Sequence, residues 1–146
     1  MSKSFRSALL LVAGLTVALT TLSFAQDQKV TLPRYDTAKE VHLKVTIQDI
    51  KQVPVGNGMR EVLNVKSGDD LLDVYLSPKD YLDMIEADLA KGDEIDLTGA
   101  KMTDSNNKPI IEAREIVKGQ NTIVLRDDKG APAWTWMEKI NPAEGK

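Results

Sequence analysis

The stretch that decides the fold is residues 91–117, which read KGDEIDLTGAKMTDSNNKPIIEAREIV. Gly92 is placed in a turn that ends the preceding segment, because glycine takes the positive φ that most residues resist. Residues 94–102 then alternate between polar and apolar side chains, which is the period-2 pattern of a half-buried strand. Residues 103–108 are polar and predict a hairpin loop, and residues 109–117 predict the returning strand.

Three further strands are predicted before this hairpin. Residues 40–53 alternate in the same way until Asp49, which stands where an apolar residue is due. One extra residue in a strand indicates a bulge, and a bulge bends the strand. Residues 59–66 and 71–76 predict the second and third strands, each preceded by a turn that contains glycine.

A helix is predicted after the third strand. Ser77 is a suitable N-cap because its hydroxyl can accept a free N–H of the first turn, and Pro78 suits the first helical position. The helix is expected to run to about Ala90, where the Gly92 turn ends it. Its apolar stripe has helical spacing and comprises Tyr81, Leu82, Ile85 and Leu89.

The order of these elements favours one fold class. Three strands, one helix between the third and fourth strands, and two further strands fit a mostly β, five-stranded OB-fold Greek-key barrel over residues 40–126. The bent first strand can serve both halves of such a barrel. Residues 121–126 predict a possible extra C-terminal strand. A small α+β sandwich is the structural alternative.

The two ends of the chain predict export and flanking segments. Residues 1–25 combine Lys3 and Arg6 with a 15-residue apolar run and small residues before a predicted cut, which indicates a cleaved signal peptide. An uncleaved membrane anchor is the alternative, although spanning a bilayer takes about 20 apolar residues. Residues 26–39 predict an N-terminal arm, and residues 127–146 predict a C-terminal tail. The expected location is periplasmic or secreted, in a bacterium.

The charge balance makes nucleic acid an unfavoured partner. The chain has 19 basic and 22 acidic residues, and two of the basic residues lie in the first 25, so the remainder has 17 basic against 22 acidic residues, a net charge of −5. Binding through phosphates usually needs the opposite balance. An acidic chain can still carry a local basic groove. The absence of cysteine excludes disulfides, thiolate metal sites and cysteine nucleophiles.

No motif predicts an enzyme, a cofactor or a metal site. The one histidine, His42, is expected on the solvent face of the first strand, without a partner at metal-ligand spacing. Residues 104–115 echo a calcium loop. Lys108 stands where an oxygen ligand is required, however, and Pro109 replaces the glycine of the turn. Pairs of acidic residues in the predicted turns are typical of solvated loops.

Four short motifs carry a resemblance to a known group of proteins. They are YLSP at 75–78, KGDEIDLTG at 91–99, KPIIEAREI at 108–116 and LRD at 125–127. Through them, residues 41–134 resemble small exported bacterial OB-fold proteins, a group largely without assigned function. The resemblance implies an OB-fold and export, and it carries over no catalytic residues.

Ligands of OB-folds bind strands two and three and the adjoining loops. Those loops are residues 54–58 and 103–108. Tyr75 is the only aromatic residue of this surface that could stack a base. A solvated wall is the alternative interpretation. The candidate ligand-binding residues are Lys44, Arg60, Asn64, Lys66 and Tyr75.

Trp134 and Trp136 form a second candidate site, in the predicted tail. Two residues apart, they point the same way if the chain is extended. Either they cap the end of the barrel and bury a large apolar area, or they contact a partner.

The sequence therefore predicts an exported OB-fold binding or accessory module that acts through protein or small-ligand contacts in the cell envelope. An envelope protein is the expected partner. The alternative function is binding of single-stranded nucleic acid or an oligosaccharide on strands two and three.

Overall fold

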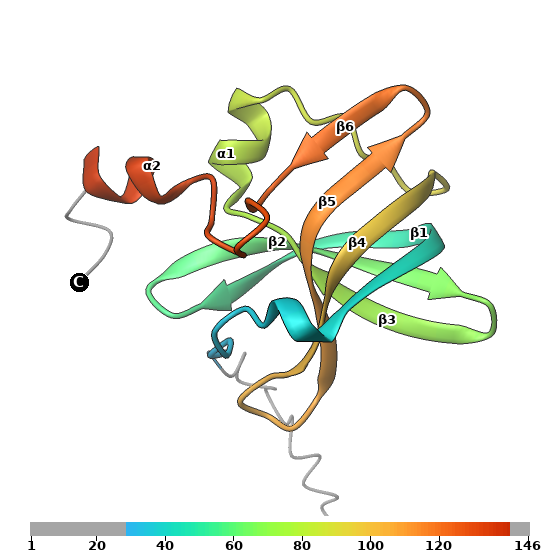
Figure 1. Ribbon diagram of the computed structural model, residues 1–146, viewed down its shortest axis with the longest axis horizontal. Helices are drawn as coiled ribbons and strands as arrows, with labels where there is room; N and C mark the ends of the chain where they lie inside the picture. The colour runs from blue at the N-terminus through green and yellow to red at the C-terminus, as the bar shows by residue number, and fades with distance from the viewer. Residues whose placement is uncertain (1–28, 141–146) are drawn as a thin grey trace, which may run out of the picture.

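The computed structural model describes residues 29–140, which form a mostly β structure (Figure 1). The predicted signal peptide, residues 26–28 and residues 141–146 lie outside the described residues. No helix within the described range is both long and apolar enough to cross a membrane. In chain order the elements are η1 (Thr37–Lys39), β1 (Glu40–Val55), β2 (Gly58–Ser67), β3 (Asp70–Tyr75), α1 (Lys79–Met84), β4 (Glu94–Thr103), β5 (Pro109–Lys118), β6 (Asn121–Val124) and α2 (Thr135–Ile140).

The strands form one six-stranded sheet in the order β3-β2-β1-β4-β5-β6, and neighbours in this order are antiparallel. β3 and β5 also pair, in parallel, from Asp73 opposite Ile110 to Tyr75 opposite Glu112. The pairings therefore form a cycle that runs from β3 through β2, β1 and β4 to β5 and back to β3. The possible extra strand is present as β6, at the end of the order.

β1 carries the bulge that the sequence predicts. Its register against β2 shifts between Ile47 and Asp49, so Gln48 is the extra residue. The Gly92 turn, with φ of 93°, is attached at the same point. The Gly92 N–H donates to the Ile47 carbonyl over 2.8 Å, and the Ile47 N–H donates to the Asp93 carbonyl over 2.9 Å. The stretch that begins at residue 91 is thus hydrogen-bonded to the bend of the first strand.

The prediction that the helix runs to about Ala90 is wrong, because α1 ends at Met84. Glu86 takes a φ of 54°, and the Ala87 N–H donates to the Leu82 carbonyl over 2.9 Å. This six-to-one bond across a residue of positive φ is the helix ending that glycine usually provides. The positive φ that follows the helix therefore belongs to a glutamate, and Gly92 belongs to a separate turn.

Ser77 is also not the N-cap. Pro78 occupies that position and has no side-chain cap hydrogen bond. The Ser77 hydroxyl is fully buried and donates to the Pro78 carbonyl over 3.1 Å. The predicted apolar stripe still packs on the core, although only its first half is helical; its members are Tyr81, Leu82, Ile85 and Leu89.

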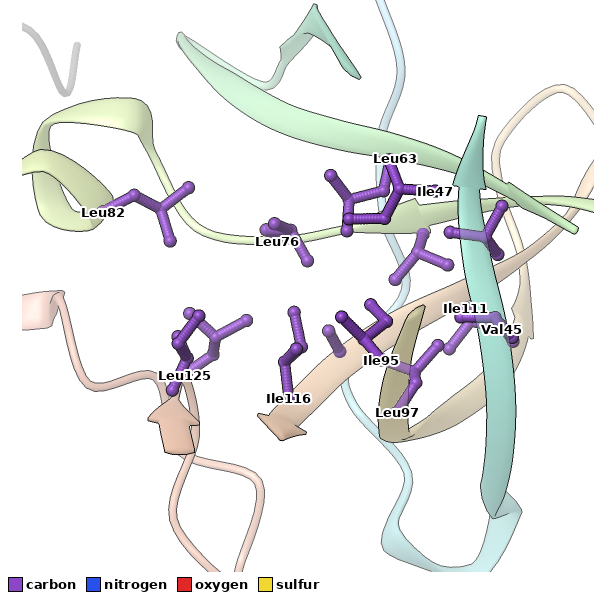
Figure 2. Packing of buried hydrophobic residues seen from close by; sticks show 14 of the residues in the cluster. Val45, Ile47, Leu63, Leu76, Leu82, Ile95, Leu97, Ile111, Ile116 and Leu125 are labelled. Carbon is purple, nitrogen blue, oxygen red and sulfur yellow. The ribbon is translucent and has the colours of Figure 1, made fainter. Parts of the chain in front are cut away.

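The main core lies inside the cycle of strands. Figure 2 shows side chains from β1, β2, β4 and β5 pointing toward one another, with Leu82 of α1 reaching in from one end. Burying one such leucine or isoleucine stabilises the fold by about 1.5–3 kcal/mol. The largest contributors that are almost fully buried include Ile47, Leu63, Leu76, Ile95, Leu97, Ile111, Ile116 and Leu125.

A smaller buried cluster lies on the other face of β3, and it contradicts the prediction that Tyr75 faces outward. Tyr75 is only 5% exposed and packs with Val62 and Met102. Val30 of the arm completes this cluster, and its N–H donates to the Pro54 carbonyl over 3.1 Å. The arm therefore covers a face that the sequence pattern leaves open.

Candidate functional site

Asn64 and its neighbours form an ionic network around a buried carboxylate, that of Asp73. Asp73 is 4% exposed and accepts hydrogen bonds from Asn64 Nδ2 over 2.9 Å, from Lys51 Nζ over 3.3 Å and from Lys108 Nζ. Burial would raise the pKa of Asp73, but the hydrogen bonds from Lys108 and Asn64 outweigh it and hold this pKa below its usual value. The network joins β1, β2 and β3 to the loop between β4 and β5, so Asn64 has a structural partner.

We expect Asp73→Asn to lower the free energy of unfolding at neutral pH by about 2 kcal/mol, because the two lysines lose a charged acceptor. The pKa of Asp73 is lower in the folded state, so its stabilising contribution is present above the unfolded pKa of about 3.9 and is lost as the pH falls through the folded value. Stability should therefore fall less steeply with acid in the variant than in the wild type. Urea unfolding at a series of pH values measures this, and equal slopes would contradict it.

The loop whose sequence resembles a calcium site is stabilised by hydrogen bonds to its own aspartate, Asp104. Asp104 is 6% exposed, and its Oδ1 accepts the backbone N–H groups of Asn106 over 2.8 Å and Lys108 over 3.0 Å. The carboxylate thus supports the hairpin turn in the way that aspartate commonly does. In the part of the chain that the structure describes, no group of three His, Asp or Glu side chains is arranged to hold a metal ion.

A groove opens between three segments that are far apart in the sequence. Its walls are residues 31–35 of the arm, residues 55–60 of the β1–β2 hairpin and, after β6, Arg126 together with parts of residues 129–137, and we call it the C-terminal groove. In Figure 1 the hairpin tip and the red C-terminal segment lie on the left of the view, with the blue arm below them. Gln52, residues 78–80 and Glu112 complete the lining.

Four side chains form a ladder in this groove. The guanidinium carbon of Arg60 lies 4.6 Å from the centre of the Trp134 ring. The guanidinium carbon of Arg126 lies 5.1 Å from the Trp134 ring and 5.0 Å from the Tyr35 ring. Such cation–π contacts are attractive, more so where water is excluded. The ladder therefore attaches the segment after β6 to β2 on one side and to the arm on the other.

A charged pair lies at the floor of the groove. Arg126 Nη1 donates to the Gly130 carbonyl over 3.0 Å, and Nη2 lies 3.7 Å from Glu112 Oε1. Both side chains are buried, and Glu112 Oε2 accepts no hydrogen bond from the described residues. Burial raises the pKa of Glu112 although Arg126 and Arg60 oppose it, and burial lowers the pKa of Arg126. The groove therefore contains a buried ion pair in which one carboxylate oxygen of Glu112 accepts no hydrogen bond from the described residues.

The profile of the MamS/MamX magnetosome protein family matches residues 35–123, well over half of the chain. The chain belongs to the MamS/MamX magnetosome protein family. None of the curated proteins matches it at a significant level. The region matched by the MamS/MamX family includes Tyr35, Arg60 and Glu112 of the groove, whereas Arg126 and Trp134 follow it.

In this MamS/MamX family protein, the groove contains only some of the predicted ligand-binding residues and only one of the two tryptophans. Arg60 of the ligand-binding set meets Trp134 of the tail. Lys44 and Lys66 are exposed on β1 and β2 and do not line the groove. The two tryptophans were expected to point the same way only if the chain is extended, and the structure does not meet this condition, because Trp136 lies in α2. Trp134 is 1% exposed, whereas Trp136 is 45% exposed.

Three residues of the groove in this MamS/MamX family protein were not predicted as site residues from the sequence. Tyr35 lies in an arm without periodicity, and nothing in the sequence connects it to the tail. Glu112 gives one signal, since it stands between the apolar residues Ile111 and Ala113 of β5. Arg126 follows the buried Leu125, but no spacing rule relates it to a glutamate 14 positions earlier. Only the pairing of distant segments brings these residues together.

Proposed function

We propose that this protein is an exported OB-fold binding module without catalytic chemistry, and that it holds a protein partner in the cell envelope or at the magnetosome through the C-terminal groove. The family name supports the magnetosome, and the apolar run within residues 1–25 supports export. The cycle of strand pairings, with α1 between β3 and β4 in the chain, supports the OB-fold.

The observation that carries this proposal is the groove itself. It is bounded by three separate segments, it contains both a buried ion pair and a tryptophan, and Met59 stands at its edge with 45% of its surface exposed. Exposed apolar side chains beside arginine and aromatic residues are typical of protein interaction surfaces. The single histidine, His42, lies on β1 and contacts Thr98, outside the groove lining.

The alternative of nucleic-acid or oligosaccharide binding on β2 and β3 has weaker support. Tyr75, the one aromatic residue available for stacking on that face, is buried. Asn64 already donates to Asp73. The remaining candidates there, Lys44 and Lys66, are exposed but provide no stacking surface.

Affinity capture from an envelope extract, with two matched variants, tests the proposal. Met59→Glu changes an exposed side chain in the groove, and Leu71→Glu changes an exposed side chain outside it, at the start of β3. We expect the wild type and Leu71→Glu to retain the same partner, identified by mass spectrometry, and Met59→Glu to lose it, while both variants unfold like the wild type. Retention by Met59→Glu, or loss by both variants, would reject the groove as the binding surface.

A further inference from the structure

We infer that the partner segment held in the C-terminal groove is acidic, and that it carries at least one apolar side chain between its carboxylates. This inference rests on the proposed function, and it adds the chemistry of the partner. Three features of the groove lead to it: the charge of its lining, its exposed cations, and the burial of its tryptophan.

The lining of the groove is basic although the chain is acidic. The whole sequence has a net charge of −3. Among the described residues that line the groove, Asp80 and Glu112 are the acidic members. A surface whose charge opposes that of the rest of the molecule attracts and orients a partner of the complementary sign. The five basic lining residues are Arg34, Arg60, Lys79, Arg126 and Lys129.

Two exposed cations line the groove without a partner among the described residues, Arg34 and Lys129. The Tyr35 ring packs so closely against Gly130 that a Cβ there would collide with it, so the arm and the segment after β6, which carry Arg34 and Lys129, adjoin at this point. Both side chains are exposed, and neither forms an ion pair with any of the described residues. Lys79, by contrast, is paired with Asp83 over 2.7 Å. Arg34 and Lys129 are therefore the cations best placed to bind carboxylates of a partner.

The apolar part of the groove favours a peptide over a nucleic acid. Met59 is 45% exposed and Met137 is half-buried, and both belong to the lining. Flexible methionine side chains adapt well to an apolar side chain of a partner. The Trp134 ring is 1% exposed and is contacted by the guanidinium groups of Arg60 and Arg126. It therefore offers no face on which a base could stack.

Fluorescence anisotropy with the purified protein tests the inference. The probe is a short fluorescein-labelled peptide of Glu-Glu-Leu repeats, compared with a peptide of Gln-Gln-Leu repeats and with single-stranded oligodeoxythymidine. We expect the acidic peptide to bind at least about tenfold more tightly than either comparison probe, and to weaken as salt rises from about 0.05 M to about 0.5 M. Equal binding of the two peptides, or tighter binding of the oligonucleotide, would overturn the inference.

Two double variants locate the binding. Arg34→Glu with Lys129→Glu reverses the exposed cations of the groove, and Lys44→Glu with Lys66→Glu reverses two exposed lysines outside it. The first pair should weaken acidic-peptide binding at least about tenfold, and the second should change it less than about twofold. Both variants make the same change in net charge, so a difference between them reports the position of the reversed charges. An equal loss in both variants would show that net charge, not the groove, is responsible.

Tryptophan emission provides an independent readout, because the protein has two tryptophans and Trp134 lines the groove. In a Trp136→Phe variant, acidic peptide should shift the emission of Trp134, and the oligonucleotide should not.

The two proposals fail in different ways. If Met59→Glu loses the captured partner but the acidic peptide does not bind, the binding function stands and the acidic class is wrong. If Met59→Glu still retains the partner, the groove is not the docking surface, and the proposed function fails whatever the peptide does.

Discussion

Trp134→Ala is expected to lower the free energy of unfolding by about 4 kcal/mol, because truncating a buried tryptophan removes its packing and leaves a cavity. Trp134 is 1% exposed, contacts Arg60 and Arg126 with its ring, and lies 6.1 Å from the ring of Tyr81. The variant would also leave Arg126 buried without one of its stacking partners. Urea unfolding followed by circular dichroism measures the change, since it does not depend on tryptophan emission.

Trp136→Ala is the matched control for this experiment. It removes the same side chain from a position that is 45% exposed in α2, so its effect on stability should stay within about 0.5 kcal/mol. Comparable losses in both variants would mean that α2 packs on the sheet more tightly than its exposure indicates. A negligible loss in Trp134→Ala would show that the segment after β6 contributes nothing to the stability of the fold.

Gly99→Ala should destabilise the protein by about 3 kcal/mol, because the added methyl group has no space. A Cβ at this position would lie 2.5 Å from the Glu112 carbonyl oxygen and 2.7 Å from Ile111 Cγ2. The register of β4 against β5 shifts between Thr98 and Gly99, which brings the two backbones close at this point. Thermal and urea unfolding measure the loss.

Gly58→Ala is the control for this second prediction. No heavy atom lies within 4 Å of a Cβ built at Gly58, which is exposed at the start of β2. Its effect should stay within about 0.5 kcal/mol. If Gly99→Ala is tolerated equally well, β5 moves away from β4 at low cost, and the close approach of the two strands does not require glycine.

Local patterns predicted most of the strands and the bulge. Alternation of side chains reports which face of a strand is buried, and it located the slip at Asp49 because one extra residue changes the phase of the pattern. The same reasoning failed for Tyr75, because alternation cannot show that a second layer covers the other face. That layer includes Val30 of the arm.

The helix shows a second limit of local reasoning. Gly92 was the strongest stop signal after Ser77, yet α1 ends at Met84, and the positive φ that follows the helix belongs to Glu86, a residue without any intrinsic preference for it. The stability of a six-residue helix comes from packing, and the packed positions of the stripe continue in a non-helical segment. Propensity therefore predicted that a helix exists but not where it ends.

The sequence by itself determined the mostly β class, the strands of residues 91–117, the bulge of the first strand and the acidic charge of the whole chain, because these depend on neighbours along the chain. The tertiary structure alone decided that Tyr35, Arg60, Glu112, Arg126 and Trp134 meet in one groove. It also decided that this groove is basic in an acidic protein. The contacts of Arg126 with Glu112, of Arg60 with Trp134 and of Arg126 with Tyr35 join residues that are 14, 74 and 91 positions apart. They depend on how the strands pair and where the ends of the chain return, and no local pattern predicts them.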